Sequence, residues 1–158
     1  MPIKSIGRLL LCLVVCLGIG VVGSLSTKPE IAGWYAGIAK PFWTPPPGVF
    51  PIAWTTLYVL MAIAFWRLWD RTAPSAPRSR AMVLFAIQLA LNAAWSPVFF
   101  GWHGIRTGLA IIVLMVVTIA ATIVSALQVD RIAAWLLVPY LCWVLYASTI
   151  NAGVVALN

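Results

Sequence analysis

One apolar segment of the chain presents amide and indole side chains on a single helical face. Gln88, Asn92 and Trp95 follow each other at i, i+4 and i+7, which is the spacing of one helix face. Amides are unfavourable against lipid, so we expect Gln88 and Asn92 to face the interior of a helix bundle. Two roles stay open. In the first, Asn92 and Trp95 contact a ligand. In the second, the two amides only hold helices together, and the spacing alone slightly favours this second role.

Two further apolar segments carry aromatic stripes at the same spacing. One stripe contains Trp54, Tyr58, Met61 and Phe65, and the other brings together Tyr140, Trp143 and Ala147. Such stripes pack a core more often than they line a ligand site. Other tryptophans lie near the ends of apolar segments, as is typical of a membrane interface, namely Trp66, Trp69, Trp102 and Trp135.

Residues for acid–base or metal chemistry are scarce. The three acids, Glu30, Asp70 and Asp130, lie outside the apolar segments, so no carboxylate pair faces a common cavity. This also argues against a proton-coupled exporter, which needs an acid within a span. We expect His103, in a short turn, to be solvated and not to bind haem. The three cysteines lie in apolar segments, form no CxxC motif and predict no metal site.

The segment 34–47, WYAGIAKPFWTPPP, connects two apolar runs and is rich in Trp and Pro. Three consecutive prolines from 45 to 47 exclude a helix through that point. Its aromatic side chains suit a membrane interface or the cover of an apolar cavity. We therefore expect a stiff lid beside a helix bundle that holds a ligand.

Composition places these segments in a membrane. The 158 residues are 63% hydrophobic and 8% charged, against about 25% charged in a soluble domain. A bilayer-crossing helix needs about 20 apolar residues, which predicts an all-α bundle with five spans at about 5–26, 48–69, 81–101, 106–127 and 132–156. We expect one domain over 1–158. The first apolar run is long for a signal peptide, so we expect it to be retained. Pro97 is expected to bend or end the third span.

Charge and small residues predict orientation and self-association. Of the ten basic residues, seven lie on the side of the N-terminus and three on the other, which places the N-terminus in the cytoplasm of a bacterial cell and the C-terminus outside. The basic residues lie between apolar runs, so the net charge of +7 does not indicate nucleic-acid binding. Ala86, Ala90 and Ala94 recur every four residues and predict a homodimer contact.

Three blocks of the sequence resemble a known family. They are WYxxIxKPxWTPPxxVFPxxWTxLY at 34–58, QLALNAAWSPVFFG at 88–101 and WLLVPYLCW at 135–143. In this order they resemble the tryptophan-rich sensory protein/translocator protein family (TspO/MBR), which includes the mitochondrial peripheral-type benzodiazepine receptor. The resemblance extends over nearly the whole chain.

This resemblance implies a five-helix bundle, often dimeric, that binds porphyrins such as protoporphyrin IX or haem beneath the first loop and requires no cofactor. Matching by motif, the pocket tryptophans fall on Trp54 and Trp143, the helix-three asparagine on Asn92, and the lid residues on Trp34 and Trp43. With the faces described above, the expected ligand contacts are Trp34, Trp43, Trp54, Tyr58, Asn92, Trp95, Tyr140, Trp143 and Ala147.

Three functions stay open within this resemblance. The first is a porphyrin translocator or sensor. The second is a light- and oxygen-dependent enzyme that degrades porphyrins, with Trp54 and Trp143 as redox partners, and the third is a ligand-regulated scaffold. In animal members the family binds cholesterol through a C-terminal segment with a basic residue. Ala156 stands at that position here, and no Lys or Arg follows Tyr146, which argues against sterol binding.

Overall fold

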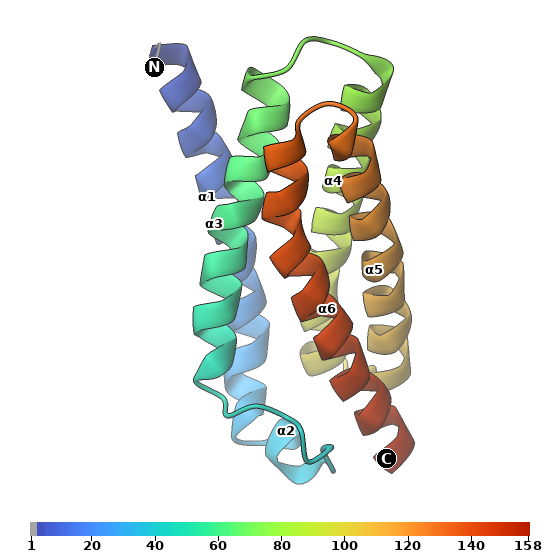
Figure 1. Cartoon of the computed structure of the whole chain (residues 1–158). Coiled ribbons are helices and arrows are strands. Elements are labelled where there is room, and N and C mark those ends of the chain that lie inside the picture. Colours follow the sequence, from blue (N-terminus) through green and yellow to red (C-terminus); the bar gives the residue numbers. More distant parts are fainter. Residues whose placement is uncertain (1–2) are drawn as a thin grey trace.

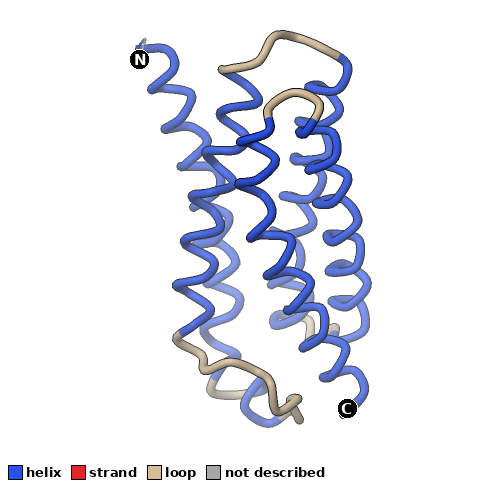
Figure 2. The backbone as a smooth tube through the Cα atoms, viewed as in Figure 1, coloured by secondary structure: helices blue, strands red, loops and turns tan. Residues whose placement is uncertain are grey.

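The computed structural model describes residues 3–158, and within them it contains helices and no strand (Figures 1 and 2). Five helical stretches are long and apolar enough to cross a membrane, which confirms the all-α, five-span prediction. They are α1 (Ile3–Ile31), α3 (Val49–Asp70), α4 (Ala76–Ser96) with its π-helical continuation η1 (Pro97–Gly101), α5 (Ile105–Leu127) and α6 (Arg131–Leu157). Helices alone can span lipid as single segments because they satisfy all their own backbone hydrogen bonds.

The long helices form a closed ring around a shared core. In order around the ring, α1 packs on α3, α3 on α6, α6 on α5, α5 on α4 and α4 on α1. The bundle interior contains large, fully buried side chains from several of these helices, among them Met61, Phe85 and Tyr140. Gln88 and Asn92 are buried as well, at 1% and 7% exposed, which confirms that this polar face points inward.

Helix boundaries follow local capping chemistry. The third span begins at Ala76, before the expected residue 81, because the Ser75 hydroxyl accepts a hydrogen bond from the Arg78 amide and a proline occupies the first turn. Asp130 caps α6 in the same way, since its Oδ1 accepts from the amides of Ile132 and Ala133 at 2.9 and 3.1 Å. These caps place helix starts that hydropathy alone cannot locate.

Pro97 neither ends the third span nor simply bends it. The helix continues through Gly101 as a π-helical turn, closed by a hydrogen bond of 3.0 Å from the Trp102 amide to the Pro97 carbonyl. Proline lacks the amide hydrogen that an α-helix needs at this point, and the wider turn accommodates it. The consecutive residues Phe99 and Phe100 within this turn are both buried.

The first connecting segment, residues 32–48, crosses the end of the bundle that also carries the C-terminus (Figure 1). It contains the short helix α2 (Trp34–Gly37) and then runs without helix through the prolines to Val49, as the sequence predicted. Asn158 fixes its middle, because the side-chain oxygen accepts from the Ala39 amide at 3.1 Å and the side-chain nitrogen donates to the Ala39 carbonyl at 3.0 Å.

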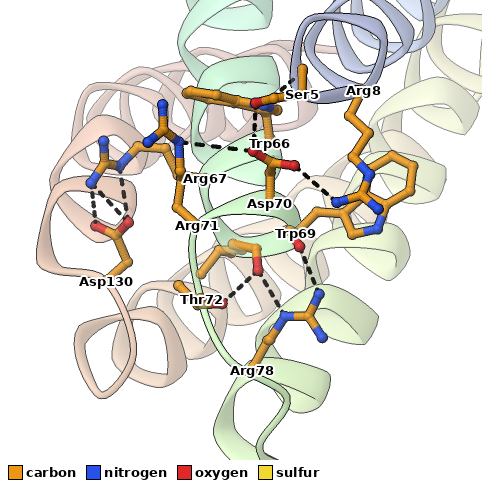
Figure 3. Close-up of polar contacts among 11 residues, drawn as sticks. Ser5, Arg8, Trp66, Arg67, Trp69, Asp70, Arg71, Thr72, Arg78 and Asp130 are labelled. Carbon is orange, nitrogen blue, oxygen red and sulfur yellow. Dashed lines mark hydrogen bonds and ion pairs between the residues drawn. The ribbon is translucent and has the colours of Figure 1, made fainter. Parts of the chain in front are cut away.

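The opposite end of the bundle is held by charged side chains (Figure 3). Asp70 at the end of α3 accepts hydrogen bonds from Ser5 and Arg8 of α1, and Arg67 donates two hydrogen bonds to Asp130. Trp66 also belongs here. It is 6% exposed and donates to the Ser5 carbonyl, so the expectation of an interfacial position is wrong for this residue. The indole packs between helices because its N–H finds a partner inside the protein.

Candidate functional site

A chain of three polar side chains crosses the middle of the bundle. The Tyr58 hydroxyl of α3 donates to Asn92 Oδ1 of α4 at 2.6 Å, and Asn92 Nδ2 donates to the Tyr140 hydroxyl of α6 at 3.1 Å. All three residues are buried. Asn92 thereby joins three helices, because its amide can accept and donate at the same time.

Two tryptophans flank this chain. Trp54 lies one turn before Tyr58 and stacks on it with ring centroids 5.5 Å apart, and its edge meets Trp143 at 6.5 Å. Trp143 Nε1 is buried and has no hydrogen-bond partner among the described residues. A buried N–H without a partner is unfavourable, so it is available to an acceptor on a ligand. We refer to Trp54, Tyr58, Asn92, Tyr140 and Trp143 as the central cluster.

Trp95 belongs to a second group nearer the first connecting segment. Its ring stacks on Phe99 at 5.0 Å, and its Nε1 donates to Asn151 of α6 at 3.3 Å. Trp34 meets Phe99 edge-on at 5.6 Å, and Tyr35 lies 5.3 Å from Phe100. We call these side chains the lid-end cluster; its members are Trp34, Tyr35, Trp95, Phe99, Phe100 and Asn151.

Lys40 is a charged side chain that organises the connecting segment. Its Nζ donates to the carbonyls of Tyr35 and Ile38 at 2.6 and 2.8 Å and lies 4.7 Å from the centre of the Tyr35 ring. Burial raises the pKa of the Tyr35 phenol, so that ring stays neutral beside the ammonium group. Lys40 therefore stiffens the segment and places a positive charge against one ring of the lid-end cluster.

The two remaining predicted contacts lie outside both clusters. Trp43 is 41% exposed, stacks edge-on with Phe42, and accepts a hydrogen bond on its carbonyl from Tyr146 at 2.6 Å. Ala147 is half-buried against the core. Phe99 and Phe100 were absent from the predicted set because the helical stripe that contains Gln88, Asn92 and Trp95 does not include them, and the structure places both in the π-helical turn that begins at Pro97.

His103 is more constrained than a solvated turn residue. Its ring is parallel to Trp34 at 4.3 Å, and its Nε2 lies 3.0 Å from a carboxylate oxygen of Glu30 at the end of α1. Its φ of 54° is unusual for a residue other than glycine. The side chain is 44% exposed, so the expectation of solvent contact holds, but these contacts tie the α4–α5 connection to the first segment.

The clusters offer binding chemistry. They present ring faces, phenol hydroxyls and amides, and no carboxylate or ammonium group lies in the central cluster. Within residues 3–158, no three His, Cys, Asp or Glu side chains gather where a metal ion could be held. Ala86, Ala90 and Ala94 are exposed along the outside of α4, so this face is free for the predicted dimer contact, which stays a prediction.

Comparison with known proteins gives consistent matches. The model of the TspO/MBR family matches residues 12–157. The tryptophan-rich protein TspO of Chlorobaculum tepidum is 39% identical over 155 residues, which cover 98% of each chain. The tryptophan-rich sensory protein of Cereibacter sphaeroides is 39% identical over 92% of this chain and 88% of its own. The translocator protein of Homo sapiens is 38% identical over 82% of this chain and 78% of its own.

Proposed function

The chain belongs to the TspO/MBR family, and we propose that it is a membrane protein that binds a porphyrin, such as protoporphyrin IX or haem, as a translocator or a sensor. The names of its relatives, translocator protein and tryptophan-rich sensory protein, support these two roles. The observation that carries the proposal is the central cluster. It combines stacking surfaces with the unpaired Trp143 N–H inside an apolar bundle, which suits a flat macrocycle with a polar edge.

The ligand occupies the central cluster in this proposal, and segment 34–47 covers it as a lid. Trp54 and Trp143 meet edge-on, so a macrocycle that lies between them displaces one of the two rings. The contacts of Lys40 and of Asn158 with the segment support its role as a stiff cover. Binding needs no cofactor, because stacking and burial provide the affinity.

The proposed setting is a bacterial cell membrane with the N-terminus in the cytoplasm. The seven basic residues on the N-terminal side, against three on the other, support this orientation. The lid, the lid-end cluster and the C-terminus then lie at the external side.

Porphyrin titration of aromatic variants tests the proposal. We expect Trp54→Ala and Trp143→Ala to weaken protoporphyrin IX binding by roughly 30-fold, since a buried aromatic anchor commonly contributes about 2 kcal/mol or more. Trp135→Ala is the matched control, because Trp135 is 67% exposed on the same helix as Trp143. Quenching of the remaining tryptophans in darkness measures the affinity. Equal losses in all three variants would place the porphyrin on the lipid-facing surface and contradict the proposal.

Light-dependent porphyrin breakdown is the second candidate. The contact of Trp54 with Trp143 and with Tyr140, at ring distances of 6.5 and 6.3 Å, favours it because these are oxidisable rings. Illumination of the porphyrin complex in air, followed by its absorption spectrum, separates the candidates. Bleaching that Trp54→Phe and Trp143→Phe abolish while binding persists would assign a redox role; a stable spectrum would favour binding without turnover.

A further inference from the structure

A groove runs along the outside of the bundle between α3 and α6. It has a volume of about 480 Å³, within the range of small-molecule sites. Each helix contributes four lining residues, which are Ala53, Thr56, Leu57 and Leu60 from α3 and Pro139, Cys142, Trp143 and Tyr146 from α6. Both helices are membrane spans, so the groove opens toward the lipid. A molecule that enters it comes from the acyl-chain region and must be lipid-soluble.

The groove lining offers little to a polar ligand. The Thr56 hydroxyl donates to the Ile52 carbonyl of its own helix at 2.9 Å, and the Tyr146 hydroxyl donates to the Trp43 carbonyl at 2.6 Å. Trp143 Nε1 has no hydrogen-bond partner among the described residues, but this atom is buried and does not reach the groove surface. The groove surface therefore matches an apolar ring system, and an acceptor on that ring system can meet Trp143 Nε1 only beyond the groove, on the side of the central cluster.

Trp143 forms the wall between the groove and the central cluster. Its side chain borders the groove and also meets Trp54 at 6.5 Å. The Phe50 ring meets the Trp143 indole edge-on with centroids 5.9 Å apart, and the Tyr146 ring is tilted against it at 5.8 Å. Rotation of this one indole would therefore open the groove toward Trp54.

The direct polar link between the two helices lies at one end. Arg67 of α3 binds Asp130, the cap of α6, at the end opposite the lid. Along the groove, the described residues show no direct side-chain hydrogen bond between α3 and α6, since Tyr58 and Tyr140 meet only through Asn92 of α4. Figure 1 shows the two helices separating toward the lid end. Pro139, whose nitrogen cannot donate to the Trp135 carbonyl, weakens α6 at the groove.

We propose that this groove is a lateral portal through which the porphyrin passes between the lipid and the central cluster, with the Trp143 indole as its gate. The inference rests on the proposed porphyrin binding and adds the route and the side chain that controls it. The alternative route passes beneath the lid, where the Asn158 contacts with Ala39 would have to open.

The native thiols provide the first test. Cys142 is exposed in the groove, whereas Cys12 and Cys16 are buried, so a maleimide should label Cys142 selectively in lipid nanodiscs. We expect protoporphyrin IX in darkness to slow this labelling. The control replaces Cys142 by Ala and places the thiol at Val117, which is 60% exposed on α5. Its labelling should not change, and equal rates with and without porphyrin at Cys142 would count against the portal.

Groove-filling substitutions provide the second test. Ala53→Phe or Cys142→Phe should slow both association and dissociation of protoporphyrin IX by about tenfold, the effect of about 1.4 kcal/mol added to the barrier. The affinity should change less than the rates, because neither Ala53 nor Cys142 belongs to the central cluster. Ala110→Phe on the exposed face of α5 is the matched control. Cys142 is exposed, so its variant should fold even if Ala53→Phe does not.

The outcomes separate the portal from the proposed function. Normal tryptophan quenching with unchanged rates in both groove variants overturns the portal and leaves porphyrin binding intact. Asn158→Ala should leave the association and dissociation rates of the porphyrin unchanged. If this variant binds and releases porphyrin faster while the groove variants keep normal rates, the route passes beneath the lid instead. Absence of porphyrin quenching in the unsubstituted protein overturns the proposed function and the portal together.

Discussion

At the scale of single residues, Asn92 is the central connection of the bundle. It accepts from Tyr58 and donates to Tyr140, and each of these side chains comes from a different helix. In the apolar interior an unpaired hydroxyl has no water to bind, so the loss of one partner affects both tyrosines. The same residue therefore supports the fold and shapes the site in which the ligand is proposed to bind.

We expect Asn92→Ala to lower the free energy of unfolding by about 1–3 kcal/mol, because it leaves two buried hydroxyl groups without their partner. Thermal unfolding in detergent measures the effect. Ser24→Ala is the control, since that hydroxyl only donates to the Val21 carbonyl of its own helix. Equal stability of the two variants would mean that the tyrosines find other partners and that the polar chain is not a structural element.

At the scale of elements, the approach of α1 to α3 depends on a glycine. A Cβ atom added at Gly20 would lie 2.6 Å from the Tyr58 ring, whereas one added at Gly18 meets no atom within 4 Å. The same helix thus has one position where a methyl group is excluded and another where it is free. Tyr58 can reach Asn92 only if α1 leaves this space for its ring.

Gly20→Ala should therefore destabilise the protein by about 1–3 kcal/mol, as overpacking does in other cores, and should displace Tyr58 from Asn92. Gly18→Ala should be neutral or slightly stabilising, since alanine favours helix where space allows. Paired unfolding curves, with tyrosine fluorescence as a local probe, compare them. Equal free energies of unfolding in the two variants would show that α1 can move away from Tyr58 at little energetic cost.

The start of α6 combines a helix cap with an ion pair in Asp130. Its carboxylate accepts from two backbone amides and from Arg67. Asp130→Ala removes both interactions, whereas Asp130→Ser retains a capping hydroxyl. We expect the serine variant to recover about 1 kcal/mol of the stability that the alanine variant loses, as measured by unfolding. Equal losses would assign the effect to the ion pair alone.

At the scale of the whole molecule, charge is distributed unevenly between the two ends. The end with the N-terminus gathers the ion pairs of Figure 3, while the end with the lid is aromatic and carries few charges. An odd number of spans places the termini on opposite sides of the membrane. The positive-inside preference then supports the proposed orientation, in which the N-terminal end faces the cytoplasm.

Topology reporters fused after Ser75 and after Asn158 check this orientation. We expect a cytoplasmic signal at the first position and an external signal at the second, because seven of the ten basic residues lie on the N-terminal side. Signals from the same side would contradict the odd number of spans. An exchange of the two signals would reverse the orientation and leave the bundle unchanged.

The exposed alanine row on α4 predicts how two bundles meet. Ala90→Phe should convert cross-linked homodimer to monomer, since bulk at its centre prevents the close approach that small residues permit. Ala110→Phe, on the exposed face of α5, should leave the dimer fraction unchanged. Cross-linking in membranes measures both. An unaltered dimer in the folded Ala90 variant would place the interface elsewhere.

The sequence by itself determined the five spans, their approximate limits and the inward direction of Gln88 and Asn92. These follow from local physics, because lipid requires long apolar helices with satisfied backbones and disfavours exposed amides. It also placed Trp54 and Tyr58 on one helical stripe and Tyr140 and Trp143 on another. Residues at fixed helical spacing share a face whatever the neighbouring helix is.

Only the tertiary structure decided which faces meet. It separated Trp95 from the central cluster and left Trp43 largely exposed, because the order of helices in the ring and their rotation depend on contacts between distant residues. The π-helical turn that contains the buried residues Phe99 and Phe100 begins at Pro97, and the groove between α3 and α6 exists only once those helices are side by side. The spacing of residues along one helix predicts neither the turn nor the groove, because both result from the way the five spans pack together.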